Sequence, residues 1–142
     1  MLMRTIWTLL VFVVIGPGLG GAFLIVILNV LDLLSGRGLV PVSSMVTMVP
    51  YFWSFAWAQA VLIGLAMLLV WRLLPARRPR LLASVPVGAL CMLVATPLLY
   101  GRSLLDFASE PFGAILAVAA GLATLPSQMI VEAIVTRVSQ ET

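Results

Sequence analysis

Two long apolar halves flank one short basic segment, which runs from Arg72 to Arg80 and holds four of the eight basic residues of the chain. Each half contains apolar runs long enough to cross a lipid bilayer, at roughly 20 residues per helical span. Arg and Lys beside membrane helices are retained preferentially on the cytoplasmic side. We therefore place this basic segment in the cytoplasm, and it sets the expected orientation of the rest of the chain.

The composition is typical of a membrane protein. Hydrophobic residues make up 63% of the 142 residues and charged residues 9%, whereas soluble domains average roughly 25% charged residues. A chain of this length accommodates about four spans with short loops and leaves no room for a soluble domain of about 50 residues or more. We expect residues 1–142 to form a single transmembrane domain.

We predict an all-α fold, an up-and-down bundle of four transmembrane helices. The predicted spans cover residues 5–34, 46–71, 81–100 and 112–135. The first begins like a signal peptide, but its apolar run continues beyond the roughly 7–15 residues of such a peptide, so we expect it to be retained. Because it is longer than one span needs, it should tilt, project or bend at Gly16–Gly21.

The distribution of basic residues favours the same orientation. The expected inner side holds six arginines and the outer side two: Arg4, Arg72, Arg77, Arg78, Arg80 and Arg137 against Arg37 and Arg102. With four spans, both termini are then cytoplasmic. The net charge of +3 does not indicate nucleic-acid binding, because no basic segment is long enough to line a groove of DNA or RNA. We expect the four arginines between residues 72 and 80 to contact anionic lipid headgroups instead.

Few polar side chains fall inside the predicted spans. The candidates for a polar lining are Asn29, Asp32, Gln59, Gln128 and Glu132. Asp32 either forms an outer ion or proton site or is an interfacial carboxylate, solvated or paired with Arg37 or Arg102. Glu132 either contacts a partner or a gate, or is a border charge paired with Arg72 or Arg137. Both lie near a predicted membrane surface, where a charge costs less than at the centre, so we favour the structural interpretation.

Gln59 differs because it falls near the middle of the second span, where an amide needs a hydrogen-bond partner. Its structural interpretation is a hydrogen bond between helices. Its functional interpretation is contact with a substrate. We favour the structural one, since interhelical hydrogen bonds are a common use of polar side chains in membranes.

Small residues recur at four-residue spacing, which places them on one helix face and lets two backbones approach closely. The fourth span has Gly113, Ala117 and Gly121, and the first has Gly16 and Gly20. The stretch Gly16–Gly21, which includes a proline, has two interpretations. It is either a kink with a smooth packing face or a helix broken around a substrate, as in some transporters. We favour the kink because apolar residues flank it.

The sequence predicts no enzyme, cofactor or metal site. It contains no His and only Cys91, which removes the commonest metal ligand and general base and any cysteine cluster. Its Ser and Thr residues have no His or Lys nearby to act as a base. A phosphate-binding loop would end in Lys followed by Ser or Thr, and no such motif is present.

Two motifs resemble a known group of proteins. Both motifs lie in the first half of the chain. One is Ile15–Gly21, with the pattern Gly-Pro-x-x-Gly-Gly, and the other is Tyr51–Trp57, which precedes a stretch rich in Ala, Leu and Gly. Together they resemble small four-span bacterial inner-membrane proteins of uncharacterised type. The resemblance implies a bacterial inner-membrane location and brings no function with it.

By subtraction, the sequence favours a non-enzymatic membrane protein that acts through helix–helix contacts, as an accessory, assembly or stabilising subunit of a membrane complex, or as a homo-oligomer. The alternative is a small oligomeric transporter or channel lined by the amides of Asn29, Gln59 and Gln128. A third hypothesis is a lipid-handling protein whose basic segment contacts headgroups. A pore would require the three amides to meet in one cavity, and this requirement separates the first two hypotheses.

Overall fold

A computed structural model describes residues 2–39, 41, 47, 49–101, 103–138 and 140. The expected start of the second span at residue 46, and Arg102, lie outside these described residues. The helices are α1 (Leu2–Val14), α2 (Gly16–Leu34), α4 (Val49–Leu73), α5 (Arg77–Tyr100), α6 (Leu104–Ser109) and α7 (Pro111–Val138). The described part of the chain is all-helical and contains no strand.

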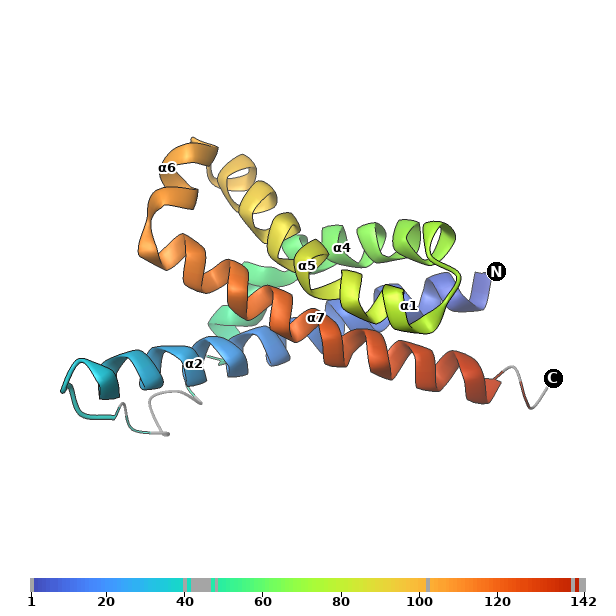
Figure 1. The fold of residues 1–142 in the computed structure, drawn as a ribbon, viewed down its shortest axis with the longest axis horizontal. Helices are drawn as coiled ribbons and strands as arrows, with labels where there is room; N and C mark the ends of the chain where they lie inside the picture. The colour runs from blue at the N-terminus through green and yellow to red at the C-terminus, as the bar shows by residue number, and fades with distance from the viewer. Residues whose placement is uncertain are drawn as a thin grey trace.

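Four helical segments within the described residues are long and apolar enough to cross a membrane. They are the joined α1 and α2, most of α4, α5 and α7, which correspond to the four predicted spans. The N-terminal end of α1, the connection from α4 to α5 and the C-terminal end of α7 lie at the same end of the molecule (Figure 1). We call it the basic end, because six arginines belong to these segments. The C-terminal end of α2, followed by Arg37, lies at the opposite end (Figure 1).

The first apolar run is divided at Ile15, where α1 ends and α2 begins, and it does not unwind there. Ile15 keeps helical dihedral angles (φ −94°, ψ −37°). Its backbone N–H donates to the carbonyl of Val11 at 2.9 Å, and its own carbonyl accepts from the N–H of Leu19 at 3.0 Å. Pro17, in the first turn of α2, has no N–H to donate and its ring crowds the preceding turn, which accounts for the interruption at this point.

The basic segment is mostly helical. Only Leu74, Pro75 and Ala76 separate α4 from α5, whereas the sequence indicated a hinge extending to Arg80. Pro79 is the third residue of α5, a position in the first turn where a missing backbone N–H costs little. Because α5 starts at Arg77 and not at residue 81, Arg77 and Arg80 lie one helical turn apart and project from one face.

The connection between α5 and α7, which the sequence did not predict to be helical, contains α6. The side chain of Ser103 caps this helix by accepting from the N–H of Asp106 at 3.4 Å. Phe107 of α6 is buried and packs with Leu24, Met92 and Leu116 of the long helices. Burial of this aromatic ring holds the loop against the bundle.

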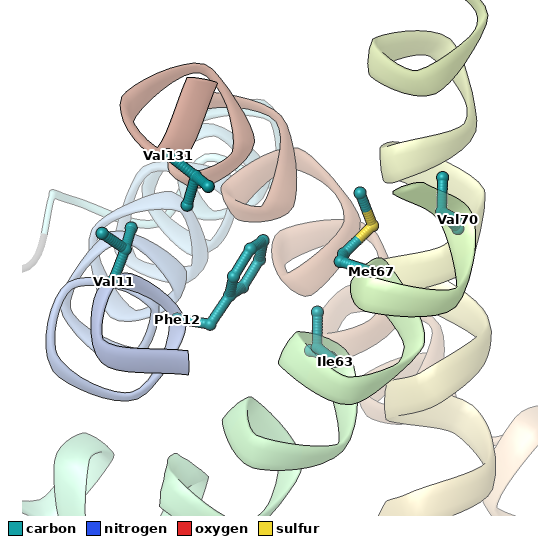
Figure 2. Packing of buried hydrophobic residues seen from close by; sticks show 6 residues of the cluster. All are labelled: Val11, Phe12, Ile63, Met67, Val70 and Val131. Carbon is teal, nitrogen blue, oxygen red and sulfur yellow. The ribbon is translucent and has the colours of Figure 1, made fainter. Parts of the chain in front are cut away.

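The core forms around α7, which packs against α1, α2, α5 and α6. Half of its most apolar stretch is buried, compared with 28–33% for the other three spans. One core cluster joins α1, α4 and α7 through Val11, Phe12, Ile63, Met67, Val70 and Val131. Figure 2 shows the Phe12 ring lying between Val131 and Met67. The outer faces of α2, α4 and α5 carry exposed Leu and Val side chains.

Candidate functional site

A buried ion-pair cluster occupies the basic end of the bundle. Glu132 of α7 accepts from Nε of Arg77 through Oε2 and from Nε of Arg80 through Oε1, both at 2.8 Å. The Arg80 and Glu132 residues are only 6% and 5% exposed, whereas the Arg77 side chain is 66% exposed. Burial of both charges of the Arg80–Glu132 pair makes each dependent on the other, because an isolated ion would be strongly disfavoured in this environment.

The surrounding groups satisfy most of the remaining hydrogen-bonding capacity of this pair. Gln128, one helical turn before Glu132, donates from Nε2 to Oε1 at 3.2 Å. A terminal nitrogen of Arg80 donates to the carbonyls of Leu74 and Pro75 at 3.3 and 3.1 Å. These two carbonyls follow the end of α4 and have no partner in the helix itself. Arg80 therefore ties the end of α4 to α7.

Trp71 adds an aromatic surface to this cluster. The Arg80 guanidinium lies 3.6 Å from the centre of the Trp71 ring, and the Arg4 guanidinium lies 4.4 Å from it. Cation–π contacts of this kind contribute about 0.5–2 kcal/mol each, depending on exposure. The contacts of Arg4 and Arg80 with the Trp71 ring were not predicted from the sequence. No sequence signal reveals them, since the three residues come from three different helices.

From the sequence, the expected partner of Glu132 was Arg72 or Arg137, and the structure places Arg77 and Arg80 beside it instead. Arg72 and Arg78 are exposed, and within the described residues neither forms an ion pair. The difference arises from the early start of α5, which brings Arg77 and Arg80 across from Glu132 on α7. If the helix α5 had been predicted to start at Arg77, the three-residue spacing would have placed Arg77 and Arg80 on one helix face.

A second feature is an apolar cavity of about 70 Å³ in the middle of the bundle. Its walls come from α1, α2, α4, α5 and α7, and include Gly16, Pro17, Gly20 and Gly21 from the start of α2. Apart from Gln59 and Thr124, the side chains that line it are apolar. The Thr124 hydroxyl donates to the carbonyl of Ala120 at 2.8 Å within its own helix. Gln59 therefore gives the cavity its main polar character.

Gln59 is buried without a hydrogen-bond partner. It is 1% exposed, and neither its amide nitrogen nor its amide oxygen bonds to any described residue. An unsatisfied buried polar group costs roughly 1–3 kcal/mol. A water molecule needs about 10–15 Å³ of such a cavity, so the space beside Gln59 can hold water or a small guest. Its amide offers a guest both a donor and an acceptor.

The other predicted lining residues do not reach this cavity. Gln128 lies in the ion-pair cluster, where its Oε1 has no partner among the described residues. Asn29 donates from Nδ2 to the carbonyl of Ile25, one turn back in α2, at 2.9 Å. Asp32 lies near the end of α2, where its backbone carbonyl accepts from the N–H of Arg37 at 2.8 Å. The structure thus separates the three amides into three places.

The small residues form contacts of different closeness. A Cβ added at Gly121 would lie 2.8 Å from the Val85 carbonyl oxygen of α5, and one at Gly113 would overlap the Phe107 carbonyl of α6. Ala117 is buried between them along α7. A Cβ at Gly20 would reach Ala123 at 4.0 Å, and one at Gly16 would meet nothing within 4 Å. The helices α5 and α7 therefore touch closely, whereas α2 stands farther from α7.

No cluster of three or more His, Cys, Asp or Glu residues that could hold a metal ion occurs within the described residues. The polar side chains of the cavity and of the ion-pair cluster carry two amides, a hydroxyl, a carboxylate and guanidinium groups. Comparisons with protein-family models, with curated proteins and with solved structures found no match to this chain.

Proposed function

We propose that this chain is a multi-pass membrane protein that acts through contacts between helices and not by catalysis. It serves as an accessory, assembly or stabilising subunit of a larger membrane complex, or as a homo-oligomer, in a bacterial inner membrane. Both termini and the connection from α4 to α5 face the cytoplasm. The supporting observation for this orientation is the gathering of Arg4, Arg77, Arg80 and Arg137 at one end of the bundle.

The observation that carries the functional part is the use made of the buried polar side chains. The hydroxyls of Thr8, Ser84, Thr124 and Ser127 donate to backbone carbonyls three or four residues earlier in their own helices. The buried carboxylate, Glu132, is held by two arginines. The hydroxyls are thus used within single helices and the carboxylate between α5 and α7, so the exposed helix faces are the surfaces that remain for contact with other molecules.

Photo-crosslinking tests this proposal. A photoreactive residue replaces one of three outward-facing side chains, Val26 of α2, Leu69 of α4 or Leu90 of α5, which are 58–59% exposed. The matched control replaces Val131, which is 0% exposed. We expect at least one outward position to give a discrete protein adduct in native membranes, and native mass spectrometry to show one fixed stoichiometry. Crosslinks to lipid only, together with a monomeric mass, would overturn the proposal.

A second candidate function, a small transporter or channel that works as an oligomer, is favoured by one observation. The unpartnered amide of Gln59 lines an apolar cavity next to Gly16 and Gly20, where it offers a small guest both a donor and an acceptor. The test is labelling of Gln59→Cys by a membrane-impermeant thiol reagent in a Cys91→Ala background, with exposed Arg78→Cys as the positive control. Protection of position 59 from both sides of the membrane would exclude this function.

A further inference from the structure

The basic end contains an open hollow of about 520 Å³ that neither candidate function uses. Residues of α1, α4, α5 and α7 line it, among them Arg4, Trp71, Arg77, Arg80, Glu132 and Arg137. Four arginines and one glutamate give this lining an excess of three positive charges. The hollow lies where the ends of several helices meet, and this is the level at which lipid headgroups contact a membrane protein.

Several guanidinium groups of this hollow are available to an anion. Within the described residues, Arg4 and Arg137 form no ion pair, and both are exposed. Arg77 bonds to Glu132 through Nε only, and its side chain is 66% exposed. Each guanidinium carries five N–H donors arranged in a fork that suits phosphate oxygens. The buried Arg80–Glu132 pair, by contrast, is already satisfied and holds the floor of the hollow in place.

An adjoining apolar hollow indicates that the ligand is a lipid and not a free phosphate. This second hollow shares Arg4 and Trp71 with the first, and its other lining residues are Thr5, Leu65, Leu68, Leu69 and Arg72. The leucines follow α4 from the basic end towards the middle of the bundle. A basic hollow continuous with a leucine-lined one matches a molecule that has an anionic head and a hydrocarbon chain.

We propose that these two hollows together bind one anionic phospholipid. The phosphate of the headgroup contacts Arg4, Arg77 and Arg137, and an acyl chain lies along Leu65, Leu68 and Leu69. The proposal rests on the membrane location put forward above, but it needs no partner protein. The sequence predicted that all four arginines between residues 72 and 80 contact lipid headgroups. Arg78 lines neither hollow, so the proposal does not include it.

The test is a lipid titration of the detergent-solubilised full chain by native mass spectrometry. Phosphatidylglycerol is compared with phosphatidylcholine, and we expect the wild-type chain to bind the anionic lipid at least about tenfold more tightly. The double variant Arg4→Gln/Arg137→Gln should lose about tenfold to thirtyfold in affinity for phosphatidylglycerol. The control Arg78→Gln, an exposed arginine of the same helix as Arg77, should change the affinity by less than about threefold.

A second pair of variants tests the acyl chain. Leu69 and Leu90 are equally exposed, at 59%, but only Leu69 lines the leucine hollow. We expect Leu69→Ala to weaken phosphatidylglycerol binding by about threefold to tenfold and Leu90→Ala to leave it unchanged. Soluble glycerol 3-phosphate should fail to displace the lipid at equal concentration, and displacement would mean that the site recognises a free phosphate compound.

Three outcomes overturn the proposal: equal affinity for the two lipids, wild-type affinity in the double variant, or displacement of the lipid by glycerol 3-phosphate. Flotation with phosphatidylcholine vesicles separates this failure from a failure of the membrane location. A chain that does not float with the vesicles would contradict the membrane location and the lipid site together. A chain that floats but shows no lipid preference would contradict the lipid site alone.

Discussion

Glu132 and Gln59 are both buried polar side chains of the same bundle, yet their surroundings are opposite. Three side chains donate to the carboxylate of Glu132, from Arg77, Arg80 and Gln128. The amide of Gln59, at 1% exposure, has no partner among the described residues and borders a cavity. The comparison distinguishes a polar group that holds helices together from one that leaves room for water or a guest. Each prediction below tests one side of it.

The largest effect is expected from Glu132→Gln. The change removes the charge that compensates Arg80, which is 6% exposed, and breaking one partner out of a buried pair costs about 3–5 kcal/mol. We expect the free energy of unfolding in detergent micelles, measured by denaturant titration, to fall by that amount. The exposed Arg78, which forms no ion pair with the described residues, gives the control Arg78→Gln, with an expected change below about 0.5 kcal/mol. Equal stability of the two variants would show that the ion pair does not hold the bundle.

Glycine substitutions test why α5 and α7 pack closely at Gly88 whereas Gly16 borders a cavity. A Cβ at Gly88 of α5 would overlap the Thr124 hydroxyl and lie 3.0 Å from the Ala120 carbonyl oxygen. We expect Gly88→Ala to lower the free energy of unfolding by about 1–3 kcal/mol through overpacking. Gly16→Ala meets nothing within 4 Å and should raise the stability by about 0.5–1 kcal/mol, because Ala favours the helix. Thermal unfolding of both variants gives the comparison, and effects of the same sign would contradict it.

Replacement of the unpartnered amide tests the state of the cavity. Gln59→Met keeps a similar shape and removes both unsatisfied polar atoms, so we expect the free energy of unfolding to rise by about 1 kcal/mol. The measurement is denaturant titration of the purified chain in micelles. A loss of stability would instead mean that water or a bound molecule satisfies Gln59 in the folded protein, and the contrast with Glu132 would then disappear.

The smallest effect is expected at Trp71. Trp71→Phe keeps an aromatic ring beneath Arg4 and Arg80 but weakens both cation–π contacts, since Trp binds cations best. We expect a loss of about 0.5 kcal/mol in the free energy of unfolding. Trp57→Phe, at an exposed position of α4, is the control for loss of an indole elsewhere. A larger loss of stability for Trp57→Phe than for Trp71→Phe would show that the cation–π contacts of Trp71 do not stabilise the basic end.

Part of the fold could be predicted because it depends on local composition. The apolar runs and the Gly/Pro-rich boundaries predicted helices that the structure places within a few residues of the expected limits. For the first apolar run the sequence left tilting, projection and bending open, and the structure divides this run at Ile15 without unwinding it. The helix α6 was missed because its stability depends on burial of Phe107 against other helices, and no local pattern records that contact.

The candidate sites were less predictable than the helices. The sequence named Glu132 and Gln59 as polar residues in apolar surroundings, but it assigned Glu132 to Arg72 or Arg137 and grouped Gln59 with Asn29 and Gln128. These assignments used predicted depth alone. The structure decides them through helix rotation and crossing, which depend on close contacts such as Gly121 against Val85.

The sequence by itself determined an all-helical chain with four segments able to cross a membrane. It also showed that most arginines lie at position 4, between positions 72 and 80, and at position 137. Hydrophobicity and backbone hydrogen bonding within a helix are local, so they can be inferred without a structure. Only the tertiary structure decided that Arg77 pairs with Glu132, 55 positions away, and that Gln59 pairs with no described residue. Both outcomes follow from how closely α7 packs against its neighbours, and that distance is set jointly by side chains from several helices.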